Sequence, residues 1–96
     1  YGLAYKENVD DTRESPTMQL LARLDEHLSF GVKVYDPHVT KNIVPNQYQD
    51  FDAFLQDTEL VVIMVAHDHI KENLDRLQGM QVLDTKNICG DDAYKL

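Results

Sequence analysis

The spacing of hydrophobic positions near the start of the chain is that of an amphipathic helix. Over residues 16–29 the apolar side chains fall on one helical face, formed by Met18, Leu21, Leu24 and Leu28. Ser15 is a favourable N-cap, and Pro16 fits the first helical position, where no N–H is needed. Gly31 can adopt the left-handed conformation that ends a helix. The pattern therefore predicts a helix over residues 16–29.

Three later segments have the pattern of β-strands. In residues 32–36 apolar β-branched and polar side chains alternate, and Pro37 prevents the continuation of this segment as a central strand. Residues 60–65 are continuously apolar, which is typical of a parallel strand covered on both faces. Residues 80–84 predict a shorter strand nearer an edge of the sheet. Residues 38–49 show no period and predict a loop.

Short helical patterns lie between these strands. Asp50 can cap a helix that ends near Asp57, and Asp68 can cap a longer one that Gly79 closes. Strands that alternate with helices through short links form right-handed βαβ units. The predicted fold class is α/β, a Rossmann-like three-layer domain with a mainly parallel sheet of about four to five strands.

The first strand of this pattern is short. Only residues 1–4 precede the first polar loop, whereas strands average about five to six residues. We therefore expect a truncated first strand, with the middle of the sheet poorly paired or completed by a neighbouring chain. At the other end, the polar residues 90–96 predict a loosely held tail.

Composition limits the classes of function. A length of 96 residues predicts one domain, over residues 1–96. The net charge of −8 disfavours nucleic acid and anionic membranes as partners. The longest apolar run has seven residues, too few to span a bilayer, and the chain does not open with a signal-peptide pattern. The single cysteine suits a reducing compartment, so we expect a cytoplasmic protein.

The carboxyl ends of the predicted strands should share one rim, where ligands bind in open α/β sheets. Lys6 and Lys86 each follow a strand end and could reach a phosphate there, although both could equally be solvated surface lysines. Arg13 lies between Asp11 and Glu14, which favours an ion pair that braces the loop.

Other candidate chemistry is weaker. His67 and His69 flank Asp68 but lack a convincing third ligand, so we expect no metal. Asp36 stands where a dinucleotide-binding fold has its ribose-binding acid, but the first turn has no Gly-x-Gly-x-x-Gly, so a turn cap at Pro37 is the favoured role. We do not expect this domain to bind NAD itself. A lone cysteine such as Cys89 is more often a small hydrophobe than a nucleophile.

Four blocks of residues carry a resemblance to a known family. They are Gly2-Leu-Ala-Tyr-Lys6, Asp11-Thr-Arg-Glu-Ser-Pro16, Val34-Tyr-Asp-Pro-His38 and Val82-Leu-Asp-Thr-Lys-Asn-Ile88. In this order, over nearly the whole chain, they resemble the C-terminal UDP-binding domain of the UDP-glucose/GDP-mannose dehydrogenase family. In relatives, several apolar residues before the glycine of the first block complete the first strand.

The resemblance implies a fragment of a larger enzyme, whose N-terminal NAD-binding and central helical domains are absent here. Such enzymes oxidise the C6 alcohol of a UDP-sugar to a carboxylate in two NAD-dependent steps, and the parent is expected to be a homodimer or larger. The cysteine nucleophile of the family lies in a motif absent from this chain, and Cys89 does not match it. The fragment alone is therefore expected to be inactive and to bind no cofactor.

The resemblance also assigns roles to individual residues. Lys6 matches the active-site lysine near the sugar-nucleotide phosphates and is the expected catalytic residue, with Tyr5 beside it as a substrate-binding aromatic. Lys86 falls where many relatives have arginine and so keeps the charge but loses the bidentate fork. The signature residues that shape the domain are Asp11, Arg13, Ser15 and Asp36.

The substrate and the rival function follow from the same resemblance. The motifs look closest to members that act on N-acetylated hexosamines for surface polysaccharides, so UDP-N-acetyl-D-mannosamine or a related UDP-sugar is expected. The alternative is a non-catalytic Rossmann-like module that binds nucleotides or another protein, because a fold alone does not define a function.

Overall fold

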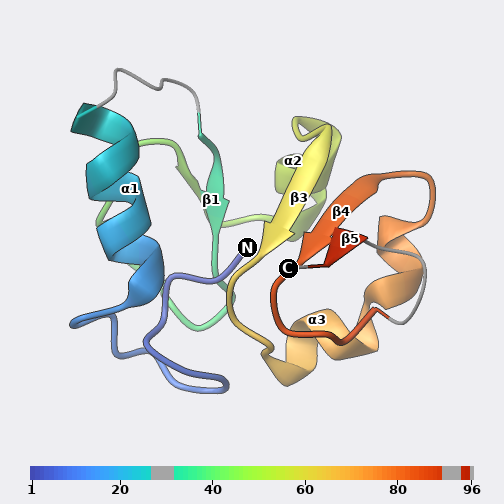
Figure 1. The fold of residues 1–96 in the computed structure, drawn as a ribbon, viewed down its shortest axis with the longest axis horizontal. Coiled ribbons are helices and arrows are strands. Elements are labelled where there is room, and N and C mark those ends of the chain that lie inside the picture. The colour runs from blue at the N-terminus through green and yellow to red at the C-terminus, as the bar shows by residue number, and fades with distance from the viewer. Residues whose placement is uncertain (27–31, 90–93, 96) are drawn as a thin grey trace.

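A computed structural model of the chain describes residues 1–26, 32–89 and 94–95. Its helices and strands alternate along the chain, which confirms the predicted α/β class (Figure 1). The helices are α1 (Pro16–Glu26), α2 (Phe51–Gln56), α3 (Asp68–Glu72) and a 3₁₀ helix, η1 (Leu74–Leu77). The strands are β1 (Val34–Tyr35), β2 (Gln47–Tyr48), β3 (Leu60–Ile63), β4 (Gln81–Asp84) and β5 (Tyr94–Lys95).

The strands form two parallel sheets. One consists of β1 and β2, and the other has the order β3–β4–β5. In Figure 1 the arrowheads of β1, β3 and β4 point towards the same edge of the domain, and the loops that follow these strands gather there. We call this edge the rim. Ligands bind at such an edge in open α/β sheets.

The N-terminal residues join the two sheets. The Tyr1 amino group donates to the Val62 carbonyl over 2.7 Å, and the Met64 N–H donates back to the Tyr1 carbonyl over 2.9 Å. On the other side, the Gly2 N–H donates to the Tyr35 carbonyl over 2.8 Å. No strand is assigned within residues 1–4, so the prediction of a truncated first strand is confirmed.

Two apolar clusters hold the elements together. The larger cluster packs the aromatic rings of the N-terminus and α2 against β3, β4 and the helices after β3, and its buried members are Tyr1, Tyr35, Phe51, Phe54, Val61, Ile63, Ile70, Leu77 and Val82. The smaller one is centred on Leu3, Val34 and Val39, and Met18 and Leu21 of α1 pack against it. The face of α1 predicted to be apolar therefore does contact the core, within the described part of the helix.

Most predicted elements are present with shorter bounds. Helix α1 begins at Pro16 as expected, and the predicted end of that helix lies outside the described residues. The strand predicted over residues 32–36 is reduced to β1, and the one over 60–65 to β3. Helix α2 has Asp50 as its N-cap, with the carboxylate accepting from the Asp52 N–H.

Four predictions about local structure are wrong. The segment 38–49 contains β2, whose two residues gain strand geometry only by pairing with β1. β4 lies between β3 and β5, so it is not at an edge, and part of the predicted loose tail forms β5. The N-cap of α3 is His67, and Asp68 is the first helical residue. Each error concerns pairing or capping that depends on residues distant in sequence.

Within the described residues, no helix has the length and apolar content needed to cross a membrane.

Candidate functional site

The centre of the rim is the buried carboxylate of Asp36, which directly follows β1. Its Oδ2 accepts from the backbone N–H groups of Leu3 and Ala4 over 2.7 and 2.9 Å, and its Oδ1 accepts from the His38 N–H over 2.8 Å. Asp36 is only 1% exposed. A single side chain thus fixes the N-terminal segment against the end of β1 and also closes the turn at Pro37, as the sequence predicted.

His67 connects this carboxylate to the end of β3. Its Nε2 lies 2.9 Å from Asp36 Oδ2, and its Nδ1 accepts from the Asn8 N–H over 2.8 Å. Because Nδ1 is an acceptor, the ring proton is on Nε2 and is donated to the carboxylate. Asn8 Oδ1 in turn accepts from the Asp68 N–H over 2.9 Å. The loop that contains Tyr5 and Lys6 is therefore tied at both ends to buried groups.

Burial and hydrogen bonding shift the pKa of Asp36 in opposite directions. Burial raises the pKa of the carboxyl, but the hydrogen bonds from His67 and from the backbone N–H groups of Ala4, His38 and Leu3 outweigh it, and the pKa is lowered. Asp36 is thus a stable buried anion whose lone pairs are directed at protein donors.

Asp84 has a similar role at the end of β4. It is 1% exposed and accepts from the backbone N–H groups of Lys86, Ile88 and Cys89 over 2.7 to 3.0 Å. Burial raises its pKa, but these N–H groups outweigh burial and lower it. The turn that carries Lys86 is thereby given a defined shape.

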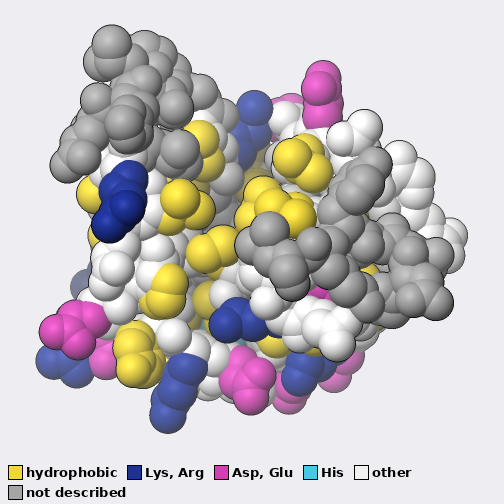
Figure 2. Space-filling model, in the orientation of Figure 1, with side chains coloured by type: hydrophobic (Ala, Val, Ile, Leu, Met, Phe, Trp, Pro, Cys, Tyr) yellow, Lys and Arg dark blue, Asp and Glu magenta, His cyan; other side chains and the backbone are white. Residues whose placement is uncertain are grey.

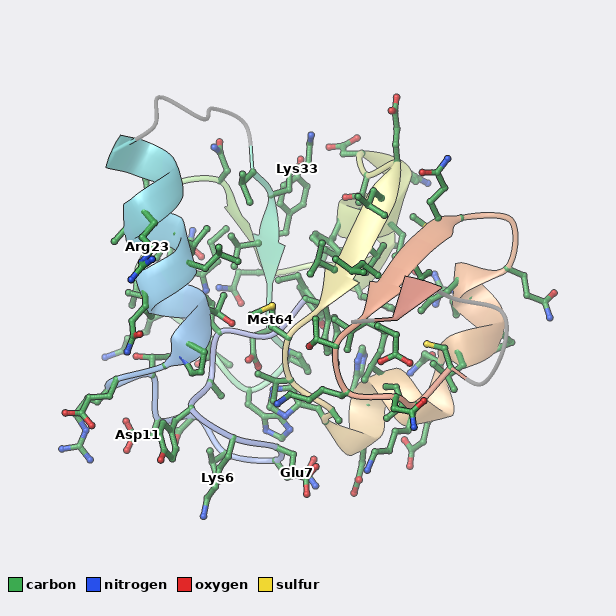
Figure 3. All side chains as sticks on the ribbon, in the orientation of Figure 1. Lys6, Glu7, Asp11, Arg23, Lys33 and Met64 are labelled. Atoms are coloured by element: carbon green, nitrogen blue, oxygen red, sulfur yellow. The ribbon has the colours of Figure 1, made fainter. Side chains whose placement is uncertain are left out.

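The predicted ligand-binding side chains lie on the rim and face solvent. Lys6 and Lys86 are exposed, and the Tyr5 ring is 54% exposed. Figure 3 shows Lys6 at the lower edge, with its side chain pointing away from the body of the domain, and Lys33 at the opposite edge. No ion pair of Lys6 or Lys86 is recorded within residues 1–26, 32–89 and 94–95. The structure thus brings the strand ends together, and the Lys6 side chain projects away from the body of the domain (Figure 3).

The loop before α1 contains the predicted signature residues. Arg13 forms a bidentate pair with Asp11, with Nε and Nη2 at 3.1 and 2.9 Å from the two carboxylate oxygens. The side-chain hydrogen bond from Arg13 is the main cause that lowers the pKa of Asp11 to about 2. The Ser15 hydroxyl accepts from the N–H groups of Thr17 and Met18, the geometry of a helix N-cap.

Sequence reasoning missed three members of this network. His67 was considered only as a metal ligand beside His69, whereas it is a buried partner of Asp36. Asn8 and Asp84 were not singled out at all. The signal that was present is positional, because each of them lies at or just after the end of a predicted strand or in the first loop. Within the described residues, no cluster of His, Cys, Asp and Glu could hold a metal ion.

The residues of the rim do not fit NAD. A dinucleotide fold binds the ribose with a free carboxylate after the second strand, and it needs glycines in the first turn for the pyrophosphate. Asp36 is buried, with both oxygens already accepting hydrogen bonds, and Tyr5 and Lys6 stand where those glycines would be.

Parallel strands, intervening helices and polar strand ends at one rim define an α/β domain of the nucleotide-binding type. Residues 1–91 match the model of the UDP-glucose/GDP-mannose dehydrogenase family, UDP binding domain. The chain belongs to this family, and the resemblance seen in its motifs is confirmed.

Individual relatives agree with this assignment. The chain is 32% identical to a UDP-N-acetyl-D-mannosamine dehydrogenase from Methanocaldococcus jannaschii, covering 99% of this chain and 23% of that protein. It is 31% identical to an NDP-N-acetyl-D-galactosaminuronic acid dehydrogenase from Ralstonia nicotianae, covering 92% and 22%. The chain thus spans about a quarter of the length of these relatives.

Solved structures show the same fold. A UDP-N-acetyl-mannosamine dehydrogenase from Staphylococcus aureus superimposes with a TM-score of 0.76 at 30% identity, covering 98% of this chain and 24% of that one. A GDP-mannose dehydrogenase from Pseudomonas aeruginosa gives a TM-score of 0.79 at 16% identity, with 98% and 26% coverage, and shows the fold alone. The Rossmann-like class is therefore confirmed.

Proposed function

We propose that this chain is the UDP-sugar-binding domain of an NAD-dependent nucleotide-sugar 6-dehydrogenase, which oxidises the C6 alcohol of the sugar to a carboxylate. The family match supports the UDP-binding role, and the names of the relatives support dehydrogenase chemistry. The observation that carries the proposal is the placement of Lys6. Its loop is fixed by Asn8, His67 and Asp36, while its ammonium group projects from the rim.

Lys6 is the proposed ligand-contacting cation in the parent enzyme. An ammonium group that projects from a rigid loop can donate to a phosphate without first breaking an ion pair. Tyr5, exposed beside it, offers an aromatic face, and Lys86 offers a second cation from the turn after β4. Because Lys6 points away from this domain, the diphosphate must also contact a part of the parent chain that lies beyond these 96 residues.

The remaining components belong to the parent enzyme. NAD would be bound outside this domain, since the rim does not fit it, and the 96-residue chain alone is expected to be inactive. We propose a cytoplasmic parent that is a homodimer or larger. The names of the relatives favour UDP-N-acetyl-D-mannosamine or a related N-acetylated UDP-sugar as substrate, for surface polysaccharide synthesis.

The test uses the full-length parent with Lys6→Ala, compared with Lys33→Ala as a control. Both substitutions remove one positive charge from an exposed lysine, but the two lysines stand at opposite edges of the domain (Figure 3). A hydrogen bond to a charged group is worth about 1.5 to 3 kcal/mol, so Lys6→Ala should lower kcat/KM for the UDP-sugar by about 10- to 100-fold. Lys33→Ala should leave it within about twofold.

Two results would count against the proposal. Equal kcat/KM for the two variants would remove the assigned role of Lys6. A parent gene that lacks a dinucleotide-binding domain would instead favour the non-catalytic nucleotide-binding module.

A further inference from the structure

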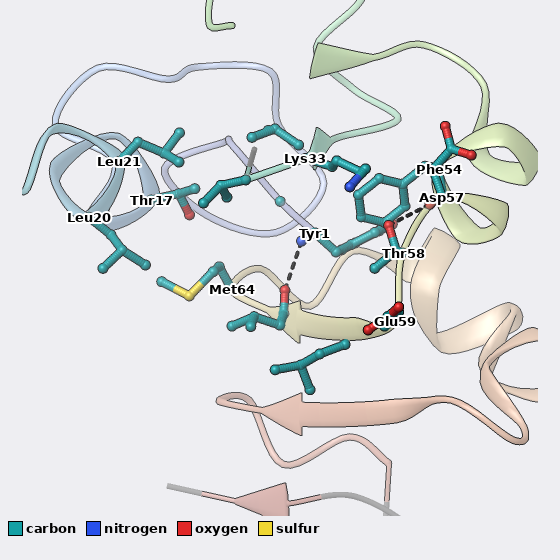
Figure 4. A pocket seen from close by; sticks show the side chains of 15 residues that line it. Tyr1, Thr17, Leu20, Leu21, Lys33, Phe54, Asp57, Thr58, Glu59 and Met64 are labelled. Atoms are coloured by element: carbon teal, nitrogen blue, oxygen red, sulfur yellow. Dashed lines mark hydrogen bonds between the residues drawn. The ribbon is translucent and has the colours of Figure 1, made fainter. Parts of the chain in front are cut away.

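The two hollowed edges of the domain differ in their titratable groups. A groove of about 450 Å³ lies between α1 and β3, opposite the rim, with Tyr1 and Gly2 at its inner end (Figure 4). Figure 2 shows hydrophobic side chains gathered in this hollow. No histidine among the described residues lines the groove, whereas the three described histidines all follow β1 or β3 at the rim. Side chains that titrate near neutral pH are therefore concentrated where Lys6 lies.

The ring of His67 has one nitrogen that can take up a further proton. Nε2 already carries the ring proton and donates it to Asp36 over 2.9 Å. Nδ1 has the remaining lone pair, which accepts from the Asn8 N–H over 2.8 Å. A protonated nitrogen is a donor and cannot accept, so a proton that binds to His67 replaces Asn8 at Nδ1. Protonation of His67 and attachment of Asn8 exclude each other.

The carboxylate partner stays charged when the ring is protonated. Burial raises the pKa of Asp36, but the hydrogen bonds from His67 and from backbone N–H groups outweigh it, and the pKa is lowered. The anion lies against the imidazole, with both side chains 0% exposed, and favours the charged ring. An added proton therefore goes to Nδ1 and leaves the contact with Asp36 in place.

Other titratable or charged groups surround the ring. They are Tyr1 from the N-terminal segment, Lys6 and Glu7 from the first loop, His38 from the turn after β1, and Asp68 and His69 from α3. The ring centroids of His38 and Tyr1 lie 4.5 and 6.1 Å from that of His67. Burial, followed by the charge of His67, lowers the pKa of His69, so these two rings oppose each other's protonation.

The loop of residues 5–8, which carries Lys6, has two attachments to the rest of the domain. At its start, the Tyr5 N–H donates to the Asp11 carbonyl over 2.6 Å. At its end, Asn8 is attached through the bond to the imidazole. Lys6 forms no hydrogen bond with the described residues and projects from the loop between these attachments (Figure 3). Release of Asn8 therefore leaves Lys6 held on one side only.

The Asn8 side chain strengthens the second attachment. Its Oδ1 accepts from the Asp68 N–H over 2.9 Å, so Asn8 bonds to two successive residues at the start of α3. Asn8 has φ +60°, a left-handed conformation that asparagine adopts more readily than most residues. His67 is fully buried and Asn8 is exposed, so release of the loop opens the newly protonated nitrogen to water.

We propose that neutral His67 is a positioning residue for Lys6, and that protonation of His67 releases loop 5–8, so that the cation loses its fixed position as the pH falls. The proton and Asn8 compete for one lone pair, so the coupling is reciprocal, and a ligand that fixes Lys6 also opposes protonation of the ring. The effect on activity rests on the proposed function of Lys6, whereas the release of the loop does not.

The test measures hydrogen exchange in the full-length parent at about pH 7.5 and about pH 5.5, corrected for the intrinsic pH dependence of exchange. Peptides that contain the Asn8 and Asp68 amides should lose about tenfold in protection at the lower pH. The Ile88 amide is the internal control, because it donates to the carboxylate of Asp84 over 2.7 Å and not to a histidine. Its protection should not change.

His67→Gln is the matched variant. Its amide oxygen can accept from Asn8 and its amide nitrogen can donate to Asp36, but the amide does not titrate. His67→Gln should therefore keep the Asn8 amide protected at both pH values. His38→Gln removes an exposed histidine beside the same ring and should behave like the unmodified protein.

Activity separates this proposal from the proposed function. Between the same two pH values, kcat/KM for UDP-N-acetyl-D-mannosamine should fall about tenfold more in the unmodified enzyme than in His67→Gln. A loop that opens as expected, without this difference in kcat/KM, supports the release by protonation and counts against the role of Lys6 in ligand binding.

Two results would overturn the release of the loop. One is equal protection of the Asn8 amide at the two pH values in the unmodified protein. The other is loss of the pH effect in His38→Gln or His69→Gln, since another histidine would then control the loop. Both results are obtained without any substitution at His67, so they decide the question even where His67→Gln does not fold.

Discussion

The rim and the groove lie at opposite edges of the same sheets and differ in the side chains that line them. At the rim, the buried carboxylates of Asp36 and Asp84 accept hydrogen bonds from the loops that follow the strands. At the groove between α1 and β3, Leu20, Val32 and Leu60 remain exposed. The loops at the rim are therefore held by buried charged groups, whereas the groove is lined by apolar side chains that stay in contact with solvent.

The largest expected effect tests how strongly the rim is built. Asp36→Ala removes the acceptor for Leu3, Ala4 and His67 at once and leaves buried donors unsatisfied. Each buried donor left without a partner costs about 1 to 3 kcal/mol, so we expect a loss of at least about 3 kcal/mol, a large part of the 5 to 15 kcal/mol typical of a domain. Urea unfolding should show a loss of this size.

The matched control for this substitution is Asp10→Ala, which also removes an aspartate but at an exposed position. It should change the free energy of unfolding by less than about 0.5 kcal/mol. If the two variants unfold at the same urea concentration, the rim does not depend on its buried carboxylate.

The second prediction concerns the inner end of the groove. Gly2 has φ +103°, and an added Cβ would lie 2.7 Å from Val65 Cβ and 2.9 Å from the Val65 nitrogen. Gly2→Ala combines backbone strain with this clash, and we expect a loss of about 2 to 4 kcal/mol. Gly79 has φ +83° but open space around it, so Gly79→Ala should cost only about 1 kcal/mol.

Thermal unfolding of the two alanine variants measures this difference. A smaller Tm loss for Gly2→Ala than for Gly79→Ala would contradict the close approach of the N-terminal segment to β3.

The smallest expected effect is a pH dependence of stability that originates at His69. Burial, followed by the charge of His67, lowers the pKa of this partly buried ring below its ordinary value of 6.5. The unfolded chain therefore binds the extra proton as the pH falls through 6.5, and stability should be present above this pH and decrease below it. His69→Gln should make urea unfolding less dependent on pH between about 5 and 8, and an unchanged slope would show that His69 is not its source.

The sequence predicted those features that depend on local patterns. The α1 start at Ser15 and Pro16 and the buried strand β3 follow from spacing and capping preferences. β2 and β5 could not be predicted, because two-residue strands of polar or mixed composition gain their geometry only from the strand beside them.

In the candidate site, too, features set by neighbouring residues could be predicted and features set by distant residues could not. The role of Asp36 as a turn cap was readable from the Asp-Pro pair, since both residues are neighbours in sequence. Its pairing with His67 bridges 31 positions and depends on the strand ends meeting at one rim. The direction of the Lys6 side chain depends on Asn8, whose N–H reaches a histidine 59 positions away. Lys6 was singled out by its place after a predicted strand end, but only the family resemblance favoured a ligand-binding role over that of a solvated surface lysine.

The pairing of Tyr1 with Val62 also has a kinetic consequence. These residues are separated by 61 positions, so the two sheets can be joined only after nearly two thirds of the chain has closed into a loop. Loop closure of this kind is entropically costly and slows folding relative to local helix formation. We expect the α2–β3–β4 half to become ordered early, and the N-terminal residues to dock last.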